Sequence, residues 1–241
     1  MTAVDPLNAA ATVPDVTVFF QRWRAWSDVV RAQPHQRDLR YGPSADETLD
    51  LFVPHQGAPL VVFFHGGYWR RLHKDDMTYV AAGLQPHGVA VAVVNYGLAP
   101  ALQLETIVAQ ARAAVGWLRR HGAGYGVDAP VTAVASLSGL HDLRAVARSF
   151  VNEWLGLDDA RAVALSPTLL APSAPCVVRA WSGERESAAF HAQGGDFAAA
   201  WRAHGCDAAY ADSPGDNHFT ICDRLRDSDD PLVARIAALA G

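Results

Sequence analysis

The 241-residue sequence has few cysteines, no long apolar run and no excess of basic residues. Its three cysteines, Cys176, Cys206 and Cys222, form no C-x-x-C pair, which argues against a zinc site or disulfide framework and for free thiols in the cytoplasm. No apolar stretch approaches the roughly 18 residues of a membrane span, and residues 1–15 lack the regions of a signal peptide. The formal charge of −5 provides no basic stripe for nucleic acid.

Motifs for metals and nucleotides are missing as well. The chain has no H-E-x-x-H, no G-x-G-x-x-G after a strand and no Walker A loop, so we expect neither a metal nor another cofactor. Half of the residues are apolar, which is enough for a substantial core. Because no linker rich in Pro, Gly or Ser divides the chain, the sequence predicts a single domain over residues 1–241.

From residue 60 onward, apolar strands alternate with amphipathic helices, which predicts an α/β fold with a mostly parallel sheet and helices on both faces. The predicted strands are 60–64, 89–95, 130–138, 176–181 and 208–211. The predicted helices are 75–85, 102–121, 142–150, 195–204 and 231–240. Before them, a helix is predicted over 16–32, and two short strands, 37–41 and 48–53, predict an antiparallel hairpin at a sheet edge.

The segment His65-Gly66-Gly67-Tyr68-Trp69 follows directly after the apolar strand 60–64. Two adjacent glycines let the backbone adopt positive φ and bring its N–H groups close to a ligand. A turn of this kind supplies part of the oxyanion hole in lipases and esterases. The nucleophile motif that such a turn serves, G-x-S-x-G, occurs nowhere in the chain. The turn is therefore also compatible with a tight bend that simply needs glycine.

Two further polar segments follow predicted strands, where the active sites of open parallel sheets lie. The first contains Glu184 and Glu186, either of which could orient a histidine. The second is a loop with His218, and a histidine suits a general base near neutral pH. Each of these residues taken singly is also explained as a solvated surface group. Their order after the H-G-G turn, carboxylate and then histidine, is the order that this kind of hydrolase requires.

Together these segments resemble the kynurenine formamidase (arylformamidase) group of α/β-hydrolases. The similarity extends along most of the chain and is carried by residues 64–70 (FHGGYWR), 95–100 (NYGLAP), 107–118, 138–143 (SGLHDL), 165–167 (LSP), 186–190 and 217–219 (NHF). The resemblance implies an α/β-hydrolase fold and hydrolysis of an aryl formamide, N-formylkynurenine, or of small esters by a Ser-His-acid mechanism. It leaves the oligomeric state open, a homodimer included, and implies no nucleic-acid or membrane partner.

The resemblance also assigns roles to residues. His218 takes the place of the catalytic base and Glu186 that of the acid, which is usually Asp in the family, with Glu184 as a neighbouring competitor. Gly66 and Gly67 correspond to the oxyanion turn. Three more residues would belong to the pocket for a small aromatic amide or ester, and the first of them would hold the turn by hydrogen bonds: His65, Tyr68 and Trp69.

The chain departs from the family at the nucleophile. In relatives a strand ending in G-H-S-A-G-G comes before the segment that here begins near Pro130, whereas in this chain residues 125–128 run straight into 129–132. Roughly 25 residues, about one βα unit, are therefore missing by comparison with the family. Ser136 and Ser138 end a predicted strand, but each has one bulky residue where an elbow needs a small one. Ser138 would stand in the elbow only if its strand moved.

Two hypotheses follow from this departure. In the first, the chain is an arylformamidase-type hydrolase whose elbow is lost from the gene or left out of the translated sequence, and it is close to inert as written. In the second, it is a non-catalytic binding protein that keeps the pocket.

Overall fold

The computed structural model describes residues 4–128 and 133–241, and the contacts divide them into two compact units. Unit 1 contains residues up to 16 together with 133–223, and unit 2 contains 17–128 together with 224–241. The first residues of the predicted strand 130–138 lie outside the described part of the chain. The single domain expected over residues 1–241 stays a prediction.

Unit 2 is built on a five-stranded sheet with the order β1-β2-β4-β3-β5. The hairpin prediction is confirmed, because β1 (Gln36–Arg40) lies at the edge and pairs antiparallel with β2 (Thr48–Phe52). β2 pairs antiparallel with β4 (Ala90–Val94), which pairs in parallel with β3 (Ala58–Phe64). β5 (Val127–Asp128) pairs with the start of β3 and was not predicted, since two residues show no periodicity.

The two apolar parallel strands of this sheet differ in burial. Every residue of β4 is fully buried, because β2 and β3 flank it on both sides. In β3 only Ala58 is buried, and residues 60–64 are half-buried. β4 pairs with residues 60–64, whereas β5 on the opposite side reaches only Ala58 and Pro59. Among the described residues, β3 therefore has no neighbouring strand on this second side beyond Pro59.

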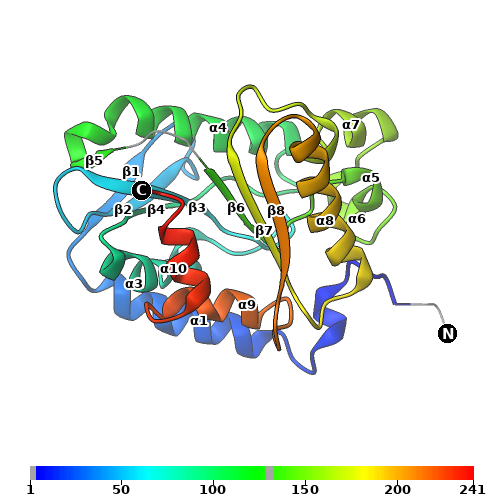
Figure 1. The fold of residues 1–241 in the computed structure, drawn as a ribbon, viewed down its shortest axis with the longest axis horizontal. Helices are drawn as coiled ribbons and strands as arrows, with labels where there is room; N and C mark the ends of the chain where they lie inside the picture. The colour runs from blue at the N-terminus through cyan, green and yellow to red at the C-terminus, as the bar shows by residue number, and fades with distance from the viewer. Residues whose placement is uncertain (1–3, 129–132) are drawn as a thin grey trace. The chain divides into compact units, whose positions relative to one another are not determined.

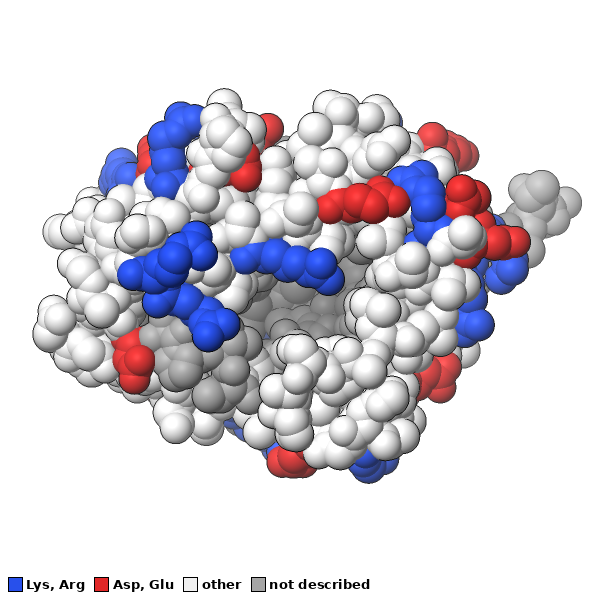
Figure 2. All heavy atoms as spheres, turned by 90° about the horizontal axis from the view of Figure 1, so that it is seen from above, with Lys and Arg blue, Asp and Glu red and all other residues white. Residues whose placement is uncertain are grey.

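The two long helices of unit 2 have bounds close to the predicted ones, whereas the bounds of its short helices differ from the predicted ones. α1 (Thr17–Arg31) and α4 (Leu104–His121) match the predicted helices, and Arg side chains gather over α4, which carries Arg112, Arg119 and Arg120 (Figure 2). The helix predicted over 75–85 is divided into α2 (Lys74–Met77) and α3 (Val80–Leu84). α10 (Pro231–Ala237) packs on α3. The core between sheet and helix is made by residues of β2, β4 and α4, among them Leu49, Leu51, Ala92, Val94, Ala114 and Leu118.

Unit 1 contains a three-stranded parallel sheet. β6 (Ala133–Leu137), β7 (Val177–Gly183) and β8 (Asp207–Ser213) lie side by side in that order (Figure 1). α8 (Ala188–Ala203) packs on β7 and β8, and the core here includes Phe197. The last paired residues of β7 and β8 are level with each other, so the loops that follow both strands start at the same edge of the sheet.

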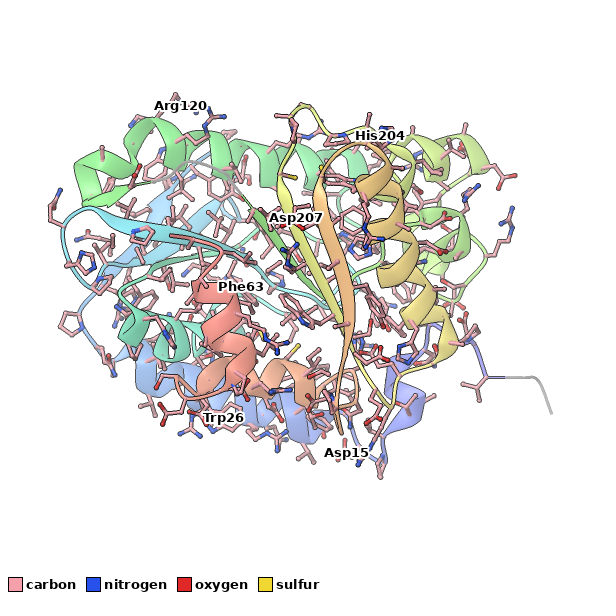
Figure 3. The ribbon with its side chains drawn as sticks, viewed as in Figure 1. Asp15, Trp26, Phe63, Arg120, His204 and Asp207 are labelled. Atoms are coloured by element: carbon pink, nitrogen blue, oxygen red, sulfur yellow. The ribbon has the colours of Figure 1, made fainter. Side chains whose placement is uncertain are left out.

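The start predicted for α8 is wrong. The helix begins at Ala188, not at residue 195, and passes through two adjacent glycines. Gly194 is tolerated inside the helix because the Tyr210 ring of β8 occupies the space that a Cβ would need. The helix ends before His204, and β8 begins at Asp207 after a tight turn (Figure 3).

The remaining elements are short. They are α5 (Leu143–Val146), which fills only part of the predicted helix 142–150, α6 (Asn152–Leu155), α7 (Asp159–Ala164), α9 (Thr220–Asp223), and the 3-10 turns η1 (Ala9–Thr12), η2 (Gln85–His87), η3 (Gly122–Tyr125), η4 (Pro167–Leu169) and η5 (Arg224–Arg226). The three cysteines are free thiols. No helix in the described ranges has the length and apolar character needed to cross a membrane.

Candidate active site

β7 and β8 bring a carboxylate and a histidine to the same edge of the unit 1 sheet. Glu186 lies in the turn between β7 and α8, and His218 lies in the loop between β8 and α9. Oε2 of Glu186 is 2.8 Å from Nδ1 of His218. The Glu186 side chain is only 1% exposed, whereas that of His218 is 21% exposed. The acid is thus buried beneath a histidine that solvent can reach.

This contact determines which nitrogen of the His218 imidazole carries the hydrogen. An ionised carboxylate only accepts hydrogen bonds, so Nδ1 of His218 carries the hydrogen and donates it to Glu186. In the neutral ring Nε2 is then the acceptor nitrogen. A histidine oriented in this way by an acid is arranged to take a proton from a nucleophile.

Local backbone geometry selects Glu186 and not Glu184 for this contact. The N–H groups of Gly183 and Glu186 close a tight turn after β7, since Gly183 N donates to Oε1 of Glu186 at 2.7 Å and Glu186 N donates to the Gly183 carbonyl at 2.9 Å. Glu184 points elsewhere, and its Oε2 accepts a hydrogen bond from Gly215 N at 2.7 Å. The catalytic roles of Glu186 and His218 stay predictions.

The loop that carries His218 is fixed on both sides. Asn217 Oδ1 accepts hydrogen bonds from the N–H groups of Phe219 and Thr220, at 2.9 and 3.0 Å, where α9 begins. The rings of Phe190 and Phe219 have their centroids 4.7 and 5.3 Å from the imidazole. These contacts hold the ring orientation. Sequence analysis included Asn217 in the segment 217–219 but assigned it no role, although its position shortly before a helix is typical of a cap.

A shallow depression lies beside this pair and is lined by Pro6, Ala9, Thr12, Glu186, Ser187, Phe190 and His218. The N-terminal segment that forms one wall is tied down at two points. Asp5 Oδ2 accepts a hydrogen bond from Phe150 N at 2.7 Å, and the Ser187 hydroxyl donates to the Pro6 carbonyl at 2.6 Å. This wall could not be predicted from the sequence, because the residues that form it are far apart in the chain.

The H-G-G turn lies in unit 2, at the carboxyl end of β3. Gly67 has a φ of 105°, and a Cβ there would collide with the Arg71 carbonyl oxygen, so only glycine fits. The Gly67 carbonyl accepts hydrogen bonds from the N–H groups of Arg70 and Arg71, both at 3.1 Å. Tyr68 and Trp69 also have positive φ, 54° and 56°. Three successive left-handed residues make this a specialised turn.

The buried His65 ring contacts the backbone of the turn. It stacks on Tyr96 with a centroid distance of 4.3 Å. Nδ1 lies 2.9 Å from the Gly66 carbonyl, and burial lowers the pKa of His65 to about 4, which keeps the ring neutral. Tyr68 and Trp69 are half-buried, and the Trp69 carbonyl accepts a hydrogen bond from Ala99 N at 2.8 Å.

The two serines considered as substitute nucleophiles have different partners. Ser136 Oγ lies 2.9 Å from Nε2 of His141, a histidine buried against Phe197. The Ser138 hydroxyl donates its hydrogen to Oε1 of Glu186. Across the described residues, no three His, Cys, Asp or Glu side chains gather in a group that could hold a metal ion.

Known proteins resemble this chain in both sequence and structure. The family model BD-FAE matches residues 49–149. Kynurenine formamidases of Danio rerio and Salmo salar are 27% and 28% identical, and each alignment covers 85% of this chain and 81% of the relative. A crystal structure from Silicibacter sp. TM1040, provisionally assigned as a thioesterase, matches with a TM-score of 0.84 at 26% identity, covering 97% of this chain and 98% of that one.

The chain is a kynurenine formamidase-like α/β-hydrolase. This finding confirms the family resemblance and the fold class predicted from the sequence. The relatives that match it in sequence are named as kynurenine formamidases and an esterase, so the similarity points to a hydrolase of the formamidase and esterase type.

Proposed function

We propose that this hydrolase descends from an enzyme that cleaves small aryl formamides, such as N-formylkynurenine, or small esters. In this proposal His218 is the general base and Glu186 is the acid that orients it and stabilises its imidazolium form. The observation that carries the proposal is the 2.8 Å contact between Oε2 of Glu186 and Nδ1 of His218.

The H-G-G turn has a second role in this proposal. Gly66 and Gly67 would supply N–H groups to the oxyanion of the tetrahedral intermediate, and the left-handed backbone at Gly67 supports this role. Tyr68 and Trp69 would offer aromatic faces to an aryl substrate. Buried and neutral, His65 would hold the turn.

We propose further that the chain as written turns over little, because it has no G-x-S-x-G to provide the nucleophile. Two observations support the loss of a βα unit. In the described residues, β6 and the part of β3 beyond Pro59 are parallel strand segments with a neighbouring strand on one side only, whereas such strands are normally flanked on both. The alignment with the Danio rerio protein runs over 238 residues but takes in only 85% of this 241-residue chain, so that relative has residues where this chain has none.

Turnover and active-site labelling test this proposal together. The purified 241-residue protein is assayed with N-formylkynurenine and p-nitrophenyl acetate, and treated with a serine-directed fluorophosphonate whose adduct is mapped by mass spectrometry. We expect rates no higher than those of His218→Ala and no stoichiometric adduct, since loss of the triad serine typically lowers kcat by about 10⁶. Stoichiometric labelling of Ser138 or Ser136 that disappears in His218→Ala would contradict the expected inactivity.

Two further measurements distinguish the origin of the inactivity. Sequencing the encoding DNA across codons 119–145, with intact mass of the protein, separates a real deletion from an omitted segment. Calorimetric titration with kynurenine tests the alternative of a binding protein: saturable heat without turnover supports a retained binding function, and no heat argues against it.

A further inference from the structure

Ser138 occupies an unusual position at the end of β6. Its φ is 50°, in the left-handed region that favours glycine, although it has a side chain. The backbone is held there, because Ser138 N donates to the Trp181 carbonyl of β7 at 2.7 Å and so extends the ladder beyond Leu137. The residue is buried, with 8% of its surface exposed. Glycine would fit this backbone with less strain, so the hydroxyl calls for an explanation.

The hydrogen bond that the Ser138 hydroxyl makes explains why this position holds serine and not glycine. Ser138 donates to Oε1 of Glu186, and Gly183 N donates to the same oxygen at 2.7 Å. The other oxygen, Oε2, faces Nδ1 of His218 at 2.8 Å. A carboxylate that is 1% exposed depends on such donors, because they replace the water that would otherwise solvate it.

We propose that Ser138 is a positioning residue for the acid of the Glu186–His218 pair. Two donors, one from β6 and one from β7, fix Oε1 and leave Oε2 directed at the imidazole. This restraint matters because Glu has one more rotatable bond than the Asp that the family usually carries, and an unrestrained carboxylate would adopt several orientations. The single hydroxyl hydrogen is already donated to the acid, which distinguishes this role from that of a nucleophile donating to Nε2.

The inference rests on the proposed function and is tested without turnover. Protein labelled with ¹⁵N-histidine shows a downfield proton resonance for an imidazole Nδ1–H bound to a buried carboxylate, and Glu186→Gln identifies the resonance of His218. The test variant is Ser138→Gly, which removes the hydroxyl while suiting the positive φ. The matched control is Ser136→Ala, which removes a hydroxyl two residues away that lies beside His141 instead.

We expect Ser138→Gly to keep or raise the thermal midpoint, while exchange of the His218 Nδ1–H with water accelerates at least tenfold. Ser136→Ala should leave the His218 resonance in place. Ser138→Ala should behave like Ser138→Gly in the spectrum but have a lower midpoint, since it keeps the strain.

Two outcomes would overturn the inference, and they differ in what else they contradict. An unchanged His218 resonance in Ser138→Gly rejects the role of Ser138 and leaves the acid–base pair intact. A wild-type protein without any such resonance rejects the pair itself, and with it both this inference and the proposed function.

Discussion

Two buried histidines, His65 and His141, show how burial controls protonation in this molecule. Burial lowers the pKa of each to about 4, because the protonated, charged ring would not be solvated by water inside the protein. His141 stacks on Phe197 with 4.1 Å between ring centroids, and its Nδ1 lies 3.2 Å from the Gln193 carbonyl. Both rings are therefore neutral near pH 7.

We predict that acid destabilises the protein through these two rings. An unfolded histidine takes up its proton near pH 6.5, but the folded ring does so only near pH 4. Their stabilising contribution is therefore complete above pH 6.5 and is lost as the pH falls towards 4. Urea unfolding should give a free energy lower by about 2 kcal/mol per histidine at pH 5.0 than at pH 7.5.

A substitution isolates the contribution of one ring. His141→Phe keeps the stack on Phe197 but cannot titrate, so the difference between the two pH values should shrink by about 2 kcal/mol. The exposed His204 supplies the control, because His204→Gln should leave the difference unchanged. Equal stability of the wild-type protein at both pH values would refute the prediction.

At the level of elements, the strands of the α/β pattern were predictable and the short helices were not. Strand β4 and helix α4 show clear periodicity over many residues, because each buries a continuous apolar surface. α6 and α9 are single turns whose helical form depends on tertiary contacts and caps, and neither leaves a period in the sequence. Spacing shared with the family was enough to select Glu186. The hydrogen bond from the Ser138 hydroxyl to this carboxylate could not be predicted, because Ser138 lies at the end of a different strand.

The open side of β3 leads to a prediction for hydrogen exchange. A strand flanked on both sides protects all of its amides, whereas a strand paired on one side protects only alternate ones. We expect slow exchange at every amide of β4 and alternating slow and fast exchange over residues 60–64 of β3, measured by NMR. Uniformly slow exchange in β3 would mean that another strand covers its second side, which would count against a missing βα unit.

At the level of the whole molecule, each of the two units contains an apolar cluster of its own. The cluster described in unit 2 extends over β2, β3, β4 and α4, whereas the one described in unit 1 is smaller and includes Val178, Phe197 and Ala208. Less buried apolar surface gives less stabilisation. Unit 1 should therefore be the less stable of the two.

Pulse-labelling hydrogen exchange with mass spectrometry along a urea gradient can measure this difference. We predict two transitions, with peptides from β7, α8 and β8 losing protection at lower urea than peptides from β2, β4 and α4. Peptides from both units that lose protection at one common midpoint would show instead that the chain unfolds as a single cooperative body.

The division of the chain between the two units has a consequence for its synthesis. Of the described residues, those before 17 belong to unit 1, the next stretch to unit 2, residues 133–223 to unit 1 again, and the last stretch to unit 2. The ribosome therefore releases the N-terminal wall of the depression first, and the segments after β7 and β8 that line the depression with it only much later. Because the segments alternate, closing the chain into a circle and reopening it anywhere would still leave each unit in separate pieces. Neither unit can be obtained as one uninterrupted fragment of this gene.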